Sequence, residues 1–288
     1  MKLKYTTSAS AMTLAAAALL SACSSVATDT EPVVADTPPV AETPTDANTD
    51  IAAKEVINPE NWPVIATAPL APAVEAKITE IMSKMTLEQK VGQVIQADSG
   101  SVTAEEVKKY RLGSVLSGGN SAPGPDPYAD AQTWLEAADA YYAASIDPEG
   151  GEIAIPVIWG IDAVHGHANL KGAVVFPHNI GLGAANNPDL IEKIYTATAK
   201  ELRVSGHDWT FAPTLAVPQN DRWGRTYEGF SESPDIVASY GDRIVYGLQG
   251  RIGDDDYLGA ERVLTSAKHF VGDGGTADGV DQGDAQIS

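Results

Sequence analysis

The chain has 288 residues, of which 43% are hydrophobic, enough for one large domain or two small ones with a buried core. Its formal net charge is −20, from 19 Lys and Arg against 39 Asp and Glu. This charge argues against nucleic acid as a partner, because phosphate contacts need Lys and Arg, and it favours an uncharged or cationic ligand.

The N-terminus is typical of an exported protein. Two lysines precede the apolar stretch AMTLAAAALL (11–20), which is too short to span a bilayer in the mature protein. The next residues, LSAC, end in Cys23, the only cysteine of the chain, and resemble the signal box of bacterial lipoproteins. We expect residues 1–23 to be a lipoprotein signal peptide with the lipid on Cys23; an ordinary signal peptide is the alternative. Ser24 after the cysteine favours the outer membrane.

Residues 24–60 have the composition of a disordered tether. They contain one basic residue and eight acids, and Thr, Pro and Ala make up most of the rest. The acids are Asp29, Glu31, Asp36, Glu42, Asp46, Asp50, Glu55 and Glu60. Such a segment buries too little apolar surface to order itself, so we expect it to lack fixed structure and to be cut readily by proteases.

From about residue 72 onward, helical and strand-like patterns alternate. Apolar spacing predicts helices over 74–85 and 128–144, and further helices that begin at the capping residues Thr86, Thr103, Asn187 and Ser233. Apolar runs predict strands within 113–119, 153–161, 209–217 and 262–271. This alternation predicts parallel βαβ units, in which functional residues collect at the carboxyl ends of the strands.

Unusual polar residues follow three of these strands. Asp162 comes directly after 153–161, the loop NDRWGRTYEGF begins at Asn220 soon after 209–217, and Lys268 and His269 lie near the end of the last run. Their common placement predicts one shared site.

Two interpretations of this site remain open. A carboxylate such as that of Asp162 can accept hydrogen bonds from two neighbouring hydroxyls, and Arg beside Trp suits the hydroxyl edge and C–H face of a sugar. The structural alternatives are a helix N-cap or core ion pair at Asp162, and a loop-anchoring Arg–Glu pair that would fit Arg222.

Other motifs point weakly to metals or cofactors. His165 and His167 have the H-x-H spacing of a zinc pair, which leaves a zinc-dependent barrel hydrolase as an alternative, but no acid-rich motif completes a metal shell. Residues 272–277 match the G-x-G-x-x-A dinucleotide fingerprint, although the segment behind them is a poor helix. The aspartates from Asp273 to Asp284 do not match the spacing of a calcium loop. We expect neither a metal nor a cofactor.

Taken together, these motifs resemble glycoside hydrolase family 3, most of all its bacterial and plant exo-β-glucanases and β-glucosidases. The stretches that carry the resemblance are MSKMTLEQKVGQ (82–93), IPVIWGIDAVHGHANLKGAVVFPHNIGLG (155–183), FAPTLAVPQNDRWGRTYEGFSESP (211–234) and AKHFVGDGGTADG (267–279). The resemblance implies an α/β fold, a (β/α)8 TIM-type barrel. Residues 61–288 would be its N-terminal portion, truncated after about five strands. It also implies retaining removal of terminal non-reducing β-D-glucose from β-glucans or β-glucosides.

The resemblance further implies a role for single residues. Carried over by motif, it implies that Asp162, Arg225, Lys268 and His269 hold the terminal glucose, with Trp159 and Trp223 lining the site. The nucleophile, an Asp in an SDW-like motif, and the acid/base Glu are expected beyond Ser288, so we expect the 288-residue chain alone to lack glycosidase activity. A carbohydrate-binding lipoprotein without chemistry is the alternative from another class.

Overall fold

The structure is a computed structural model, and it describes residues 71–286 apart from 119–120, 125 and 151–152. The expected signal peptide, with Cys23, and the expected tether lie outside the described residues. Among those residues, no helix combines the length and the apolar character that crossing a membrane requires.

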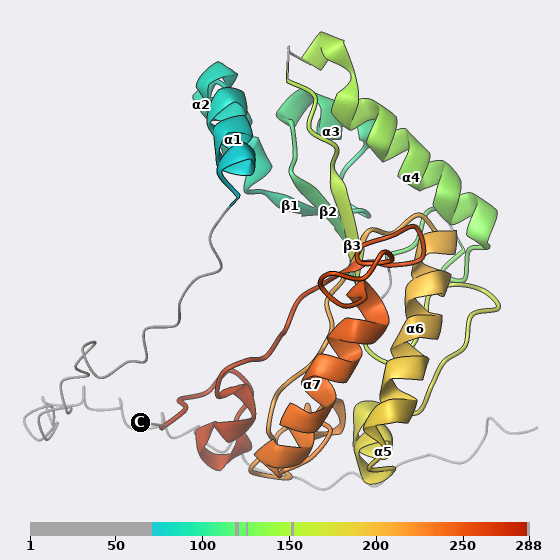
Figure 1. The fold of residues 1–288 in the computed structure, drawn as a ribbon, viewed down its shortest axis with the longest axis vertical. Helices are drawn as coiled ribbons and strands as arrows, with labels where there is room; N and C mark the ends of the chain where they lie inside the picture. Colours follow the sequence, from blue (N-terminus) through green and yellow to red (C-terminus); the bar gives the residue numbers. More distant parts are fainter. Residues whose placement is uncertain (1–70, 119–120, 125, 151–152, 287–288) are drawn as a thin grey trace, which may run out of the picture. The chain divides into compact units, whose positions relative to one another are not determined.

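The centre of the fold is a parallel sheet whose five strands pair in chain order (Figure 1). The strands are β1 (Gln96–Asp98), β2 (Ser114–Ser117), β3 (Ile158–Ile161), β4 (Trp209–Thr210) and β5 (Leu264–Thr265). The register places Val115 of β2 beside Trp159 of β3 and Ile161 of β3 beside Thr210 of β4. This confirms the expected parallel α/β sheet, which is not closed within the described residues.

Helices connect the strands, as a βα barrel requires. They are α1 (Pro72–Lys84), α2 (Leu87–Gln93), α3 (Ala104–Tyr110), α4 (Ala131–Ile146), α5 (Asn179–Ala184), α6 (Pro188–Val204) and α7 (Pro234–Gln249). Short 3₁₀ turns η2 (Pro148–Gly150), η3 (Thr226–Glu228), η4 (Asp273–Gly275) and η5 (Ala277–Gly279) lie between or after them. Helices α6 and α7 pack against each other, and α3 packs against α4 (Figure 1).

Most of the predicted helix starts are confirmed by their hydrogen bonds. Thr86 and Thr103 form complete capping boxes, in which the threonine side chain and the residue three positions later satisfy each other's backbone N–H groups. The Asn187 side chain accepts from the N–H of Leu190. Ser233 differs, because it occupies the N-cap position of α7 without making a side-chain cap bond.

The strands are shorter than the apolar runs that predicted them. Within 209–217 only two residues pair as β4, and beyond Thr210 the segment makes isolated backbone hydrogen bonds instead, such as the one from the N–H of Ser266 to the carbonyl of Ala212 at 2.9 Å. Two elements were not predicted at all. β1 was missed because QAD is polar, and α5 because NIGLGA contains two glycines.

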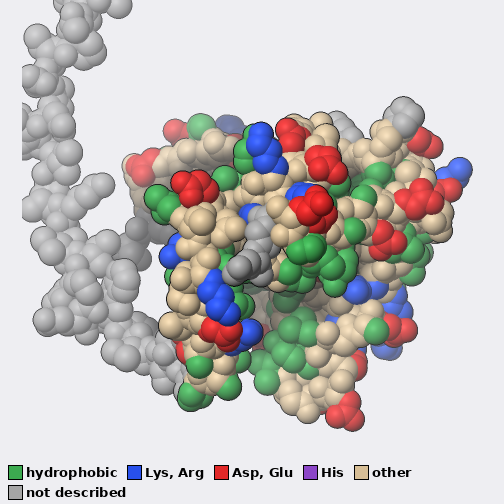
Figure 2. Space-filling view, turned by 90° about the horizontal axis from the view of Figure 1, so that it is seen from above, with side chains coloured by type: hydrophobic (Ala, Val, Ile, Leu, Met, Phe, Trp, Pro, Cys, Tyr) green, Lys and Arg blue, Asp and Glu red, His purple; other side chains and the backbone are tan. Residues whose placement is uncertain are grey.

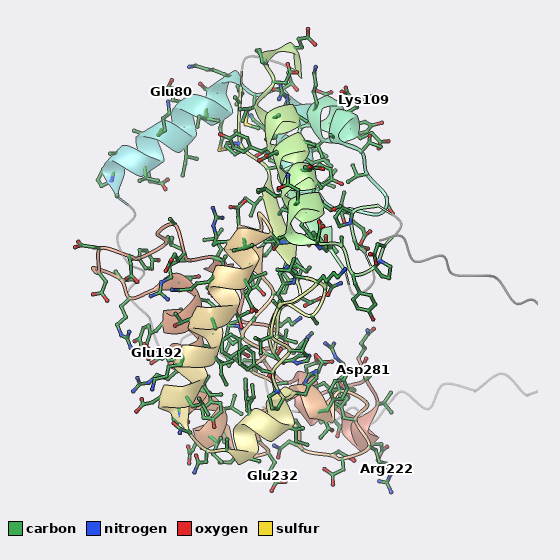
Figure 3. All side chains as sticks on the ribbon, turned by 90° about the vertical axis from the view of Figure 1, so that its right-hand side faces the viewer. Glu80, Lys109, Glu192, Arg222, Glu232 and Asp281 are labelled. Atoms are coloured by element: carbon green, nitrogen blue, oxygen red, sulfur yellow. The ribbon has the colours of Figure 1, made fainter. Side chains whose placement is uncertain are left out.

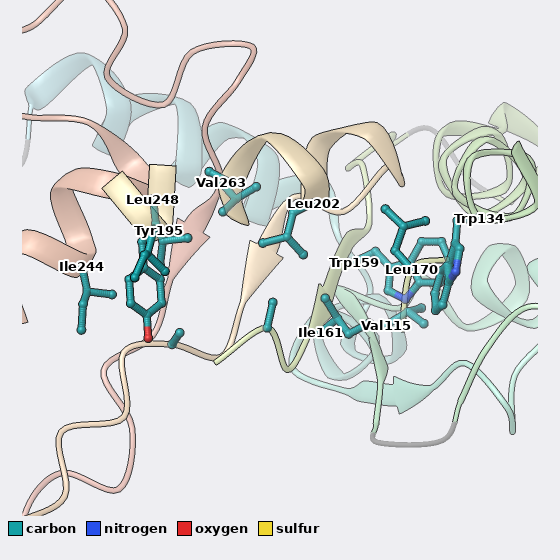
Figure 4. Close-up of a cluster of buried hydrophobic side chains, with 14 of the residues drawn as sticks. Val115, Trp134, Trp159, Ile161, Leu170, Tyr195, Leu202, Ile244, Leu248 and Val263 are labelled. Carbon is teal, nitrogen blue, oxygen red and sulfur yellow. The ribbon is translucent and has the colours of Figure 1, made fainter. Parts of the chain in front are cut away.

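The core lies between the sheet and the helices α4, α6 and α7. Trp134 of α4 and Trp159 of β3 are both buried, with ring centroids 5.5 Å apart. Figure 4 shows this pair beside Leu170 and Val115, with Tyr195, Leu202 and Leu248 of α6 and α7 in the same cluster. Trp159 and Ile161 of β3 belong to the same buried cluster as residues of α4, α6 and α7. This packing holds β3 and therefore fixes the position of Asp162, which follows it. On the face seen in the space-filling view, acidic, basic and hydrophobic side chains are interspersed (Figure 2).

Candidate active site

An ion pair joins the carboxyl ends of two strands. Asp162 follows the last residue of β3, and its Oδ1 accepts a hydrogen bond from the Nζ of Lys268, which lies three residues after β5. Both side chains remain partly exposed, at 43% for Asp162 and 21% for Lys268. The pair therefore faces solvent and can exchange part of its mutual contact for a ligand.

The backbone around Lys268 is held by the neighbouring segment after β4. Lys268 donates its N–H to the carbonyl of Pro213 at 2.9 Å and accepts from the N–H of Leu215 at 2.9 Å. The next residue, His269, has a φ of 51°, in the left-handed region that a residue with a Cβ adopts at some cost. These contacts set the direction in which both side chains leave the chain.

The loop after β4 contributes Arg225, which ion-pairs with Glu228 through two hydrogen bonds of 2.8 and 2.9 Å. Asn179, fully buried at the start of α5, holds the loop by donating to the backbone carbonyl of Glu228 at 2.8 Å. The loop-anchoring Arg–Glu pair considered for Arg222 is thus made by Arg225, while Arg222 is exposed. In Figure 3, Arg222 lies at the same end of the molecule as Asp281.

His269, the residue after Lys268, contacts Arg225. Arg225 Nη2 lies 2.5 Å from His269 Nε2, and because a guanidinium can only donate, Nε2 must accept. The ring proton is then on Nδ1, 3.2 Å from Oδ2 of Asp273. Burial, reinforced by the charges of Arg225 and Lys268, lowers the pKa of His269, which keeps the imidazole in this neutral form.

Charge around the cluster is balanced by Glu228, whose side chain is only 13% exposed. Burial works to raise the pKa of Glu228, but the hydrogen bonds and charge of Arg225 outweigh it, so the pKa lies below its usual value. The same contact raises the pKa of Arg225. Glu228 is therefore an ionised partner of Arg225 at neutral pH, which does not fit the protonated state a general acid needs.

The four residues predicted as a pocket thus form two contacting pairs, Asp162–Lys268 and Arg225–His269, which are joined because Lys268 and His269 are neighbours in the chain. Together they present several N–H donors and one partly exposed carboxylate, a set suited to a neutral ligand with many hydroxyls. Glu228 and Asp273 complete the cluster but were not predicted as site residues. Their spacing, three residues after Arg225 and four after His269, is the signal that could have found them.

The two predicted tryptophans are not exposed beside this cluster. Trp159 is 3% exposed and donates its Nε1–H to Ser117 at 3.0 Å within the core. Trp223 is 1% exposed and donates to Asp281 at 2.8 Å. Neither ring offers an open face within the described residues, because both side chains pack inside the protein.

The histidines of the H-x-H motif do not converge. His167 is fully buried and its Nε2 contacts the hydroxyl of Ser205 at 2.9 Å, whereas His165 contacts the carbonyl of Phe176 and stacks on His178, 4.2 Å between ring centroids. Among the described residues, no three His, Cys, Asp or Glu side chains are grouped so that they could hold a metal ion. In this part of the chain, the zinc-hydrolase alternative therefore has no ligand set to support it.

Comparison with known families gives a match over most of the described chain. Residues 86–287 match the family model described as the glycosyl hydrolase family 3 N terminal domain. A lysosomal beta glucosidase of Dictyostelium discoideum is 30% identical over 256 residues, which cover 83% of this chain and 30% of that protein. A periplasmic beta-glucosidase of Salmonella typhimurium is 28% identical over 226 residues, which cover 76% of this chain and 26% of that protein.

Solved structures give a similar result. An exo-1,3/1,4-beta-glucanase from a Pseudoalteromonas species is 53% identical, with a TM-score of 0.73 over 77% of this chain and 28% of that chain. A beta-glucosidase from Erythrobacter marinus is 27% identical, with a TM-score of 0.61 over 76% of this chain and 28% of that chain. The chain spans less than a third of the length of each of these relatives.

Proposed function

We propose, since the chain belongs to glycosyl hydrolase family 3, that it supplies the sugar-binding side of the active site of a retaining β-glucosidase or exo-β-glucanase. The observation that carries this proposal is the cluster of Asp162, Lys268, His269 and Arg225, which follow the carboxyl ends of the three neighbouring parallel strands β3, β4 and β5. In βα barrels this end of the strands carries the active site.

Each side chain of the cluster has a defined part in this proposal. The Asp162 carboxylate accepts hydrogen bonds from two adjacent hydroxyls of the terminal glucose. Lys268 Nζ, already within reach of Asp162, donates to a hydroxyl held between the two charges. Arg225 keeps Nε2 of His269 occupied, so that the ring is oriented when sugar binds. These bonds strengthen as the sugar ring flattens, which stabilises the transition state more than the ground state.

The two carboxyls that perform the chemistry are not assigned to residues 1–288. Retaining hydrolysis needs a nucleophile and an acid/base about 5–5.5 Å apart. The motifs that carry them in the family do not occur in this sequence. Asp162 is bound to Lys268 and Glu228 to Arg225, so each already serves as the partner of a cation.

The substrate class proposed is a β-glucan or β-glucoside with a terminal non-reducing glucose. Relatives are named as β-glucosidases, an exo-β-glucanase and β-xylosidases, and the relative with 53% identity is an exo-1,3/1,4-beta-glucanase. We expect the complete protein to hydrolyse an aryl β-glucoside with a higher kcat/KM than the matching aryl β-xyloside. The reverse order would exclude glucose as the preferred sugar.

The decisive experiment replaces Asp162 in the complete protein. Asp162→Ala should lower kcat/KM on an aryl β-glucoside by at least about 10- to 100-fold, the effect of one lost charged hydrogen bond. Asp242→Asn, an exposed carboxylate of α7, is the matched control and should leave kcat/KM unchanged. Equal activity in the two variants would refute the binding role of Asp162.

Export and anchoring are part of the same proposal. The naming of one relative as periplasmic supports export, and the LSAC motif supports a lipid on Cys23 and attachment to the outer membrane. Labelling with a radioactive fatty acid should mark the wild-type protein and not Cys23→Ser. Label retained in that variant would show that the lipid is attached to another residue.

A further inference from the structure

A cavity of about 450 Å³ lies at the opposite end of the strands from the candidate active site. Its lining includes the segment that opens β3 (156–159) and Asp208, which immediately precedes β4. Asp162, by contrast, follows β3. The volume falls within the range of about 300–1,000 Å³ that is usual for small-molecule sites.

The walls of this cavity are set by a close contact between α4 and the turn after α6. Gly206 has a φ of 83°, and a Cβ at this position would lie 2.5 Å from the Cβ of Ala138. Only glycine therefore allows the turn to touch α4 here. On the flank of this contact, Leu135, Asp139 and Tyr142 follow one another at helical spacing and line the cavity.

The flank of α4 presents apolar surface to solvent. Tyr142 is 52% exposed and Leu135 is 39% exposed. The neighbouring residues Trp134, Tyr141 and Ser145 are the buried ones of the same helix, and Tyr141 also borders the cavity. Tyr142 is thus not needed to hold α4 in place, and its exposed ring can lie against the C–H face of a sugar.

Polar groups surround this aromatic surface. Arg203 ion-pairs with Asp208 through Nη1, which also donates to the carbonyl of His207 at 3.2 Å. Within the described residues no other nitrogen of Arg203 has a partner, and the carboxylate of Asp139 has none. One guanidinium and two carboxylates give the cavity a formal charge of −1, which disfavours anionic ligands and leaves both donors and acceptors for hydroxyls.

We propose that this cavity is a second carbohydrate-binding site, which holds a glucosyl unit of a β-glucan chain remote from the candidate active site. Tyr142 provides the stacking face, and Asp139 and Arg203 bind hydroxyls. The substrate class rests on the proposed function. The site would keep the enzyme on polymeric substrate without taking part in bond cleavage.

The test separates binding at the cavity from binding at the active site. In the complete protein carrying Asp162→Ala, electrophoresis through a gel containing soluble β-1,3-glucan should still be slowed relative to a gel without polymer. Adding Tyr142→Ala should weaken this retention by about tenfold, the effect of losing one aromatic contact. Tyr142→Phe keeps the ring and should retain binding.

The matched control is Tyr110→Ala, because Tyr110 is 50% exposed and also lies on a helix, but outside the cavity. Equal retention of the Tyr142→Ala and Tyr110→Ala variants, or no retention in the Asp162→Ala background, would overturn the proposal. The single variant Tyr142→Ala should hydrolyse an aryl β-glucoside at the wild-type rate. Absence of that hydrolysis in the wild-type protein would instead refute the proposed function.

Discussion

At the scale of single residues, Glu228 holds the position on which the rest of the cluster depends. It binds both Nε and Nη2 of Arg225, and Arg225 in turn contacts His269. A substitution there acts on the sugar-binding residues through their orientation. Glu228 is therefore a positioning residue.

We predict that Glu228→Gln in the complete protein lowers kcat/KM on an aryl β-glucoside by about tenfold, because a two-bond ion pair becomes a hydrogen bond from the guanidinium to a single uncharged amide oxygen. The charge of Glu228 raises the pKa of His269, so its removal should also move the acid limb of the pH–activity profile to lower pH. A purely structural role would not move that limb.

Glu232→Gln is the control for this prediction, because Glu232 is an exposed carboxylate a few residues further along the same segment (Figure 3). It should leave both kcat/KM and the acid limb in place. If Glu228→Gln behaves like Glu232→Gln, the positioning role is wrong.

At the scale of elements, two helices begin alike in sequence and differently in structure. Both α6 and α7 start with a capping residue followed by proline. Asn187 accepts a hydrogen bond from Leu190 N–H at 3.0 Å, whereas Ser233 accepts none from its helix. The sequence predicts both starts correctly but not which of the two capping bonds forms.

We predict that Asn187→Ala lowers the free energy of unfolding by about 1 kcal/mol, the usual effect of losing an N-cap bond. Ser233→Ala, at the corresponding position of α7, should change it by less than about half of that. Urea unfolding of the two variants beside wild type measures the difference. Equal destabilisation would mean that the serine caps α7 in solution after all.

The elements also show how far a sequence pattern reaches. Helix starts were predictable because capping depends on residues three positions apart. Strand ends were not, since the regular pairing of β4 with β5 covers only Trp209 and Thr210, and its extent depends on the neighbouring strand as much as on the run itself. The candidate site, too, could be predicted only in part. Its four main residues came from motifs, while the burial of Trp159 and Trp223 depends on packing that no motif records.

At the scale of the whole molecule, the core contains a hydrogen-bonded group of polar side chains that should respond to acid. His167 and His207 are both fully buried and share the hydroxyl of Ser205, each at 2.9 Å. Trp134 packs against both imidazole rings and Trp159 against that of His207, and within the described part of the chain no carboxylate forms an ion pair with either ring. Burial lowers the pKa of His167 to about 4 and, with the charge of His167, that of His207 well below its usual value.

The two buried histidines should make the fold less stable as the pH falls. Above pH 6.5 both histidines are neutral in the folded and unfolded states. Between about 6.5 and 4 only the unfolded state takes up the proton at His167, which lowers the free energy of unfolding by about 2 kcal/mol from pH 7 to pH 5. Urea unfolding at both pH values measures this loss.

His167→Gln keeps a group at the position of Nε2 without a titrating ring, so the free energy of unfolding that this variant loses between the two pH values should be smaller by that amount. Carboxylates titrate alike in both proteins and cancel in the comparison, so an unchanged loss in His167→Gln would show that this histidine is not the acid-sensitive group.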